Sequence, residues 1–237
     1  IAGLWRDLSA DQCPDLETSV IAMAAALSHR GPDAAGVWSD AAAGVAFGHQ
    51  RLAVVDLSPA GHQPMASASG RYRIAFNGEI YNHRDLRRQL QSSGASAQPW
   101  RGHSDTETLL AAIEAWGLEG ALQRCAGMFA LSLWDRQERW LHLARDRFGE
   151  KPLYWGWLDQ AGHRVLVFAS ELAALRACPG AAAPAVNSEA LAAFFHAGCL
   201  PAPLSIYAGL QQLPPGHCLA FSSPHQHPAP QPWWALE

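Results

Sequence analysis

The sequence lacks an excess of basic residues, an apolar run of membrane length and a cationic amino-terminal leader. Its 17 Lys and Arg residues are outnumbered by 21 Asp and Glu residues, which gives a formal charge of −4 with neutral histidines. Such a chain has no positive field to attract nucleic acid or an anionic membrane, so neither is an expected partner. The longest apolar runs, such as residues 19–27, are too short to span a bilayer. Without a secretory start, a cytoplasmic location is expected.

Closely spaced metal ligands and nucleotide motifs are also missing. The five cysteines form no Cys-x-x-Cys pair, so we expect reduced, mostly buried thiols rather than a zinc or redox site. His225 and His227 lack a third ligand at a suitable spacing, so no metal is expected. No P-loop string occurs, and no nucleotide cofactor is expected within these residues.

What the sequence does contain is enough apolar material for a substantial core, since 49% of its 237 residues are hydrophobic. Helical periodicity and capping signals predict helices within 15–27, over 83–92 after Asn82, from Ser104 to about 116, and over 188–195. Strand-prone runs occur at 44–47, 52–56, 72–76, 128–134, 140–144, 153–157 and 165–168. The segments 201–215 and 222–232 are rich in proline and are expected to be irregular. Strands grouped between helices predict an α+β domain.

Three short features could bind a small polar ligand. Asn77 offers a side-chain amide beside Gly78, whose backbone N–H can approach a ligand closely, and such a pair can form an oxyanion hole. Local sequence alone favours an ordinary Asn-Gly turn between a strand and a helix. Arg51 and Asp105 could hold the carboxylate and ammonium of an amino acid by paired charges, although each alone is more typical of a surface charge.

These features occur within a series of strings whose order is typical of one family. The strings in the first half are Ile1-Ala2-Gly3, Ser28-His29-Arg30-Gly31-Pro32-Asp33, Gly48-His49-Gln50-Arg51-Leu52, Gly61-His62-Gln63-Pro64-Met65, Phe76-Asn77-Gly78-Glu79-Ile80-Tyr81-Asn82 and Ser104-Asp105-Thr106-Glu107. Those in the second half are Gly127-Met128-Phe129-Ala130, Ala144-Arg145-Asp146-Arg147-Phe148-Gly149, Lys151-Pro152-Leu153-Tyr154, Ser170-Glu171 and Leu213-Pro214-Pro215-Gly216-His217. Together they resemble the glutaminase domain of asparagine synthetases, a class II glutamine amidotransferase of the N-terminal-nucleophile hydrolase type.

The resemblance implies a four-layer αββα sandwich and a role for each candidate residue. In such domains an amino-terminal cysteine attacks the side-chain amide of glutamine, and its own α-amine, which titrates near pH 8, acts as the base. The Asn77 side chain and the Gly78 N–H would bind the oxyanion. Arg51 would bind the substrate carboxylate, and Asp105 with the Glu79 backbone would bind its ammonium. The pocket wall would be formed by Leu52, Ala53, Val54 and Val55.

The chain departs from the family pattern at both ends. The family begins Cys-Gly-Ile, whereas this sequence begins at Ile1, so the nucleophile is expected two residues before it. Cys13 cannot replace it because an internal cysteine has no free α-amine, and the chain as written cannot run the standard mechanism. We expect residues 1–221 to form the amidotransferase domain and 222–237 to be a linker towards an ATP-dependent synthetase domain. ATP and magnesium would belong only to that domain, which would use the ammonia to amidate aspartate.

Two functions stay open at this stage. The intact Arg51, Asn77, Gly78 and Asp105 favour an enzyme that hydrolyses glutamine. The alternative is a cysteine-less domain that binds glutamine or stabilises a partner without turnover. Another class II amidotransferase is disfavoured, since those usually carry a Thr-Arg-Trp type string where this chain has His49-Gln50-Arg51-Leu52. A homodimer is also an open alternative.

Other members of these strings allow more than one role. Arg30, Asp33, Arg145 and Asp146 could support the site, contact a synthetase domain or form buried ion pairs, and the sequence does not decide among these. The four histidines beside glycine, arginine or proline are expected to be structural; they are His29, His49, His62 and His217.

Overall fold

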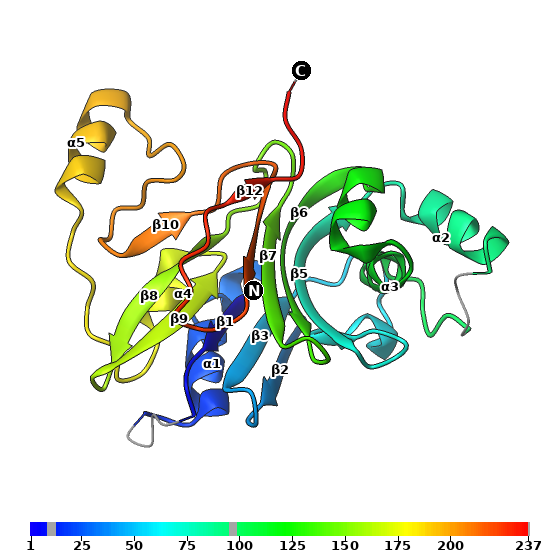
Figure 1. The fold of residues 1–237 in the computed structure, drawn as a ribbon, viewed down its shortest axis with the longest axis horizontal. Helices are drawn as coiled ribbons and strands as arrows, with labels where there is room; N and C mark the ends of the chain where they lie inside the picture. The colour runs from blue at the N-terminus through cyan, green and yellow to red at the C-terminus, as the bar shows by residue number, and fades with distance from the viewer. Residues whose placement is uncertain (9–12, 95–98, 237) are drawn as a thin grey trace.

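The computed structural model describes residues 1–8, 13–94 and 99–236, and in them two antiparallel sheets lie at the centre of the fold (Figure 1). The first sheet has the strand order β10-β8-β9-β1-β3-β2. Its strands are β1 (Ala2–Trp5), β2 (Ala34–Asp40), β3 (Val45–Arg51), β8 (Tyr154–Gln160), β9 (His163–Ala169) and β10 (Leu210–Gln212). The second sheet has the order β12-β11-β7-β6-β5-β4. Its strands are β4 (Met65–Ala66), β5 (Tyr72–Ile80), β6 (Gly127–Asp135), β7 (Trp140–Arg145), β11 (His217–Phe221) and β12 (Gln231–Pro232).

Helices cover the outer face of each sheet, which gives the four layers that the sequence predicts. Helices α1 (Leu16–Ala25) and α4 (Leu172–Arg176) pack on the first sheet, and α2 (His83–Ser92) and α3 (Asp105–Arg124) pack on the second. The space between the sheets is filled by large apolar side chains such as Phe47, Trp134 and Phe168. Helix α5 (Ser188–Ala197) lies beyond β10, away from the two sheets (Figure 1). The α+β sandwich is therefore confirmed.

Alternation along the strands decides which side chains face the inner layer. In β1, Ala2 and Leu4 pack against the helix layer, whereas Ile1 and Trp5 lie between the sheets. In β3, the odd-numbered residue Phe47 faces the inner layer in the same way. Because side chains alternate with a period of two, the odd positions at the end of β3 also face this layer.

Several predicted elements are confirmed and one predicted strand is wrong. The two segments expected to be irregular, 201–215 and 222–232, each contain a short strand, β10 and β12 respectively. The helices over 83–92 and from Ser104 are present, and Gly117, with a φ of 73°, breaks α3 next to the predicted end at 116. Asn82 precedes α2 but does not cap it, because its side chain instead binds the backbone of Arg124 and Ala126. The strand expected at 52–56 is wrong: β3 ends at Arg51, and the following residues form a loop in which Leu52 and Val54 are exposed.

The carboxyl-terminal residues expected to form a linker contact the domain over much of their described length. Strand β12 pairs with β11. Trp233 is 6% exposed, and its indole N–H donates to the carbonyl of Arg145 at 3.0 Å. These residues therefore close one edge of the second sheet.

Arg145 and Asp146 stabilise the chain through backbone partners. The Arg145 guanidinium donates to the carbonyls of Lys151, Leu213 and Gly149 at 2.6–2.7 Å. The fully buried carboxylate of Asp146 accepts four backbone N–H groups, from Phe129, Phe148, Glu150 and Lys151. These contacts stabilise the loop that brings Lys151 to a cavity between β3, β5 and α3.

Replacing Asp146 with alanine should lower the free energy of unfolding by about 3 kcal/mol, because buried N–H donors would lose their acceptor. Urea denaturation followed by circular dichroism measures the change. The matched control is Asp159→Ala, since Asp159 is exposed and its side chain caps the N–H of Gly162. Equal losses in the two variants would contradict a structural role for the buried carboxylate.

Candidate active site

A cavity of about 320 Å³ opens between the ends of β3 and β5 and the start of α3. Its volume lies in the range of small-ligand sites. Every residue that the sequence analysis assigned to substrate binding lines it: Arg51, Leu52, Ala53, Val54, Val55, Asn77, Gly78, Glu79 and Asp105. The structure therefore brings together residues that are up to 54 positions apart, counting from Arg51 to Asp105.

Asn77 lies inside β5, so the alternative of an Asn-Gly turn between strand and helix is wrong. Asn77 pairs with Ala130 of β6. Ala75, two residues earlier in the same strand, faces the inner layer that also contains Ile1. By strand alternation the Asn77 side chain projects to the same face. Its Nδ2 atom is buried and has no hydrogen-bond partner among the residues that the structure describes. A buried amide donor without a partner is costly, and a ligand oxygen in the cavity would satisfy it.

The Gly78 N–H points towards the cavity. Two residues away on either side, the Phe76 N–H donates to Gln63 Oε1 at 2.7 Å and the Ile80 N–H donates to Asp105 Oδ2 at 2.8 Å. Both bonds lie on the edge of β5 that faces away from β6. Since backbone direction repeats every two residues in a strand, the Gly78 N–H faces the same edge. A Cβ atom at this position would lie 2.2 Å from the Met128 carbonyl, which explains the glycine.

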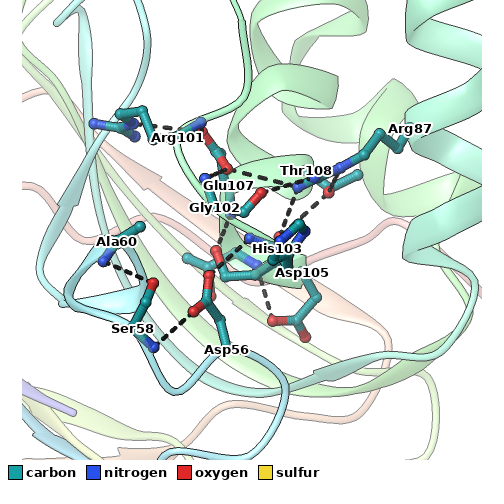
Figure 2. Close-up of polar contacts among 12 residues, drawn as sticks. Asp56, Ser58, Ala60, Arg87, Arg101, Gly102, His103, Asp105, Glu107 and Thr108 are labelled. Carbon is teal, nitrogen blue, oxygen red and sulfur yellow. Dashed lines mark hydrogen bonds and ion pairs between the residues drawn. The ribbon is translucent and has the colours of Figure 1, made fainter.

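Arg51 is buried, and its guanidinium is directed by the loop that follows β3. Its Nη2 donates to the carbonyl of Asp56. A Cβ at Gly61 would come within 2.3 Å of the same nitrogen, so glycine leaves the space for the guanidinium. The Asp56 carboxylate accepts the N–H groups of Ser58 and His103 (Figure 2). Burial opposes the charge, but these hydrogen bonds prevail and lower the pKa of Asp56 to about 2.

Asp105 is the first residue of α3 and faces the cavity with a buried carboxylate. Besides the bond from Ile80, its Oδ1 accepts the N–H of Thr106 at 2.9 Å, while Ser104 Oγ caps the helix by accepting the Glu107 N–H at 3.1 Å. Burial raises the pKa of Asp105, and the backbone hydrogen bonds only partly offset it. A cation in the cavity would favour the ionised form.

Glu79 lines the cavity in a different way from the prediction. Its carbonyl faces β6, since a Cβ at Gly127 would lie 2.1 Å from that oxygen. The side chain of Glu79 shares the strand face of Asn77. The expected contact between the Glu79 backbone and a ligand ammonium is therefore not supported, and the side chain is the part of Glu79 turned towards the cavity.

The amino end of the chain lies beside this site. The Ile1 nitrogen donates to Ser170 Oγ at 3.0 Å, and Ile1 itself is buried. Burial lowers the pKa of this amine to about 5, with a further decrease from the Arg30 guanidinium and an opposing effect of Glu171. The surroundings thus favour a neutral nitrogen over an ammonium.

The structure also brings residues to the cavity whose contact with it the sequence did not predict. They include Arg30, His49, Gln63 and Lys151, which are all members of the quoted strings. Arg30 forms an ion pair with Glu171 at 2.8 Å. Asp33 accepts the N–H of Ala53 at 2.8 Å and so holds the predicted pocket wall. Membership of the recognised strings was the only signal that could have singled these residues out.

Features outside the cavity have structural contacts. Burial raises the pKa of Cys125 to about 12 and that of Cys178 to about 11, which disfavours both thiolates. His225 pairs with Asp7, and the His227 ring lies on that of Trp157. Within the described ranges, no three His, Cys, Asp or Glu side chains are grouped to hold a metal, and none of the helices is long and apolar enough to cross a membrane.

Known proteins share this sequence and fold. Residues 1–234 match the family of glutamine amidotransferase domains. Asparagine synthetase (glutamine-hydrolyzing) 3 of Bacillus subtilis is 37% identical over 221 residues, which are 92% of this chain and 34% of that protein. A putative asparagine synthetase (glutamine-hydrolyzing) of Mycobacterium tuberculosis is 44% identical over 144 residues, covering 57% of this chain and 22% of that protein. The chain thus spans about a third or less of these relatives.

A solved structure supports the fold at lower sequence identity. Glutamine phosphoribosylpyrophosphate amidotransferase from B. subtilis, complexed with ADP and GMP, matches with a TM-score of 0.62 and 18% identity, over 92% of this chain and 46% of that one. The shared feature is the pair of antiparallel sheets between helices. This chain therefore belongs to the class II glutamine amidotransferase domain family, with the N-terminal-nucleophile hydrolase fold, and is related to asparagine synthetases through that domain.

Proposed function

We propose that this domain hydrolyses glutamine to glutamate and ammonia, with a cysteine two residues upstream of Ile1 as the nucleophile. The ammonia would serve ATP-dependent amidation of aspartate by a further domain, as the names of the asparagine synthetase relatives suggest. The cofactors ATP and magnesium would belong to that further domain. The amidotransferase domain itself would need only the cavity between β3, β5 and α3.

The observation that carries this proposal is the register of β1. Ala2 lies opposite Gly48 in the antiparallel ladder, so Ile1 lies opposite His49. If the ladder continues, the residue two positions before Ile1 would lie opposite Arg51. Alternation turns a side chain at that position to the inner layer, as it does those of Ile1 and Trp5. A cysteine there would direct its thiol to the face where Asn77 offers its unpaired amide. The Ile1 nitrogen donates to Ser170 Oγ at 3.0 Å, a hydrogen bond that a peptide N–H can also form.

The chemistry follows from these neighbours. The thiol gives its proton to the α-amine of the same residue, and its sulfur bonds to the amide carbon of glutamine. The resulting oxyanion accepts hydrogen bonds from the Asn77 side chain and the Gly78 N–H. The protonated amine then gives its proton to the leaving nitrogen, the C–N bond breaks, and ammonia departs. Water attacks the thioester, the C–S bond breaks, and glutamate and the free thiol result.

Substrate binding uses the charges at the rim of the cavity. Arg51 would bind the α-carboxylate through its guanidinium, because that group presents several donors in one plane. Asp105, with the Glu79 side chain nearby, would bind the α-ammonium. The loop of Leu52 to Val55 would cover the aliphatic part of glutamine.

The experiment is to sequence the coding region immediately upstream of Ile1 and to measure ammonia release from glutamine by the protein that includes those residues. We expect a Met-Cys-Gly start, ammonia release, and loss of that release when the cysteine is replaced by alanine. Covalent labelling by a glutamine analogue with an electrophile in place of the amide, located by mass spectrometry, checks the nucleophile. An upstream sequence without cysteine, together with glutamine binding but no release, would replace this proposal with a non-catalytic binding domain.

A further inference from the structure

The backbone of Phe76, immediately before the oxyanion pair, is held on both of its polar atoms by side chains from outside its strand. Its N–H donates to Gln63 Oε1 at 2.7 Å, and its carbonyl accepts a hydrogen bond from His49 Nε2 at 3.0 Å. Gln63 belongs to the loop before β4, and His49 belongs to β3 of the other sheet. Two distant segments therefore converge on one residue of β5.

These contacts replace a missing neighbour strand. Strand β4 covers the edge of β5 only where Met65 pairs with Ile74 and Ala66 pairs with Arg73. Beyond that point the edge of β5 turns to the cavity, where a further strand would block the site. Backbone groups on such an edge need other partners when they are buried, and Phe76 is 2% exposed. Gln63 and His49 supply them without closing the cavity.

Holding Phe76 fixes the direction of the two residues after it in the chain. The Phe76 carbonyl and the Asn77 nitrogen belong to the same planar peptide. The hydrogen bond from His49 therefore fixes the orientation of this peptide plane, and with it the backbone position of Asn77. Gly78 comes directly afterwards, with its N–H on the same edge as that of Phe76. His49 also lies beside Ile1 in the ladder of the first sheet. It therefore ties the strand that leads to the upstream residues to the strand that carries the oxyanion donors.

The chemistry of the His49 ring suits this task. A carbonyl only accepts, so Nε2 must carry the hydrogen, and Nδ1 has no partner among the described residues. Burial lowers the pKa of His49 to about 3, with the amino terminus and Arg51 adding to the effect and the Phe76 bond opposing it. The ring is thus neutral and donates to Phe76 throughout the pH range in which an α-amine can act as a base.

We infer that His49 and Gln63 are positioning residues, which clamp the Phe76 backbone and so hold the Asn77 amide and the Gly78 N–H in place for the tetrahedral intermediate. This inference rests on the proposed function. The two residues act through the oxyanion pair, so their removal should affect turnover more than substrate binding. Because both share the cavity lining with Arg51 and Asp105, KM must be measured together with kcat to separate the two effects.

The test uses the full protein with its native upstream residues and the variants His49→Leu and Gln63→Met. Each should lower kcat for glutamine hydrolysis about tenfold or more, since small misplacements of catalytic groups have effects of this size, with KM changed by less than about twofold. His49→Gln should recover most of the loss, because its amide N–H can reach the Phe76 carbonyl. Combined with Asn77→Ala, His49→Leu should lower kcat by less than the product of the two single effects.

Two control variants separate positioning from simple destabilisation. Gln160 is a buried glutamine that binds Arg6 and the Pro179 carbonyl, and His142 lies on β7; neither lines the cavity. Gln160→Met should lower Tm, and both Gln160→Met and His142→Leu should leave kcat unchanged. An unchanged kcat in His49→Leu and Gln63→Met, with an active wild-type protein, would overturn this inference alone. Failure of the wild-type protein to release ammonia would overturn the proposed function and this inference together.

Discussion

Replacement of Asn77 by alanine is expected to lower kcat for glutamine hydrolysis by about a hundredfold or more, because one donor to the oxyanion is lost. The Asn77 Nδ2 is already buried and unpaired among the described residues, so its hydrogen bond would form only when the substrate oxygen arrives. A bond that strengthens as negative charge develops lowers the barrier more than it strengthens substrate binding. KM should therefore change little. Steady-state ammonia release, in the protein that carries its native upstream residues, measures both parameters.

Asn82 provides the matched control for this variant. Its side-chain amide donates to the Arg124 carbonyl and accepts the Ala126 N–H, at a position that does not line the cavity. Asn82→Ala should lower Tm with kcat unchanged. Comparable losses of kcat in the two asparagine variants would mean that Asn77 acts through the stability of the second sheet, and an Asn77→Ala protein with normal turnover would remove it from the mechanism.

Local pattern predicted the elements that carry their own signals. The helix over 83–92 could be predicted from its helical periodicity, and the start of α3 could be predicted from the Ser104 cap. Each signal lies within a few residues of the element that it predicts. The strand at 52–56 was wrong because Leu52 and Val54 look like strand residues but lie exposed in a cavity loop. Their apolar character suits a ligand rather than a neighbouring strand. No local pattern distinguishes a branched apolar side chain that packs in a sheet from one that lies exposed in a loop beside a cavity.

The candidate site could be predicted only through the family resemblance. Asn77 and Gly78 look like a turn in isolation, and their true setting inside β5 depends on pairing with β6, about 50 residues later in the chain. The direction of the Gly78 N–H depends on side chains from further segments, including Gln63 and Asp105. The contact of His49 could not be predicted from the sequence for the same reason, since the Phe76 carbonyl that it binds belongs to the other sheet. Long-range pairing, rather than composition, decides each of these features.

The variant Asp105→Asn is expected to weaken glutamine binding by roughly thirtyfold or more, which corresponds to about 2 kcal/mol, the lower end for a lost buried charge pair. The 237-residue chain has no amino-terminal thiol, so glutamine can be titrated into it by calorimetry without being consumed. Some loss of stability should accompany the change, because the carboxylate accepts the N–H groups of both Ile80 and Thr106. Affinity must therefore be compared with a variant of similar structural effect.

Glu107→Gln is that comparison. Glu107 is a buried carboxylate in the first turn of the same helix, and it accepts the backbone N–H groups of Arg101 and Gly102 outside the cavity lining (Figure 2). Glu107→Gln should lower Tm about as much as Asp105→Asn but leave glutamine affinity unchanged. Equal affinities in the two variants would reduce Asp105 to a structural residue at the start of α3.

Acidification gives an independent measurement of the same role. Binding of an ammonium requires the ionised carboxylate, and burial raises the pKa of Asp105 above that of an ordinary aspartate. As the pH falls through this raised pKa, Asp105 takes up a proton and the attraction for the ammonium is lost. Glutamine affinity of the unaltered chain should therefore decline at a higher pH than an ordinary aspartate would give. This part of the pH dependence should be absent in Asp105→Asn and intact in Glu107→Gln. If it persists in Asp105→Asn, another carboxylate binds the ammonium, and the Glu79 side chain is the next candidate in the cavity lining.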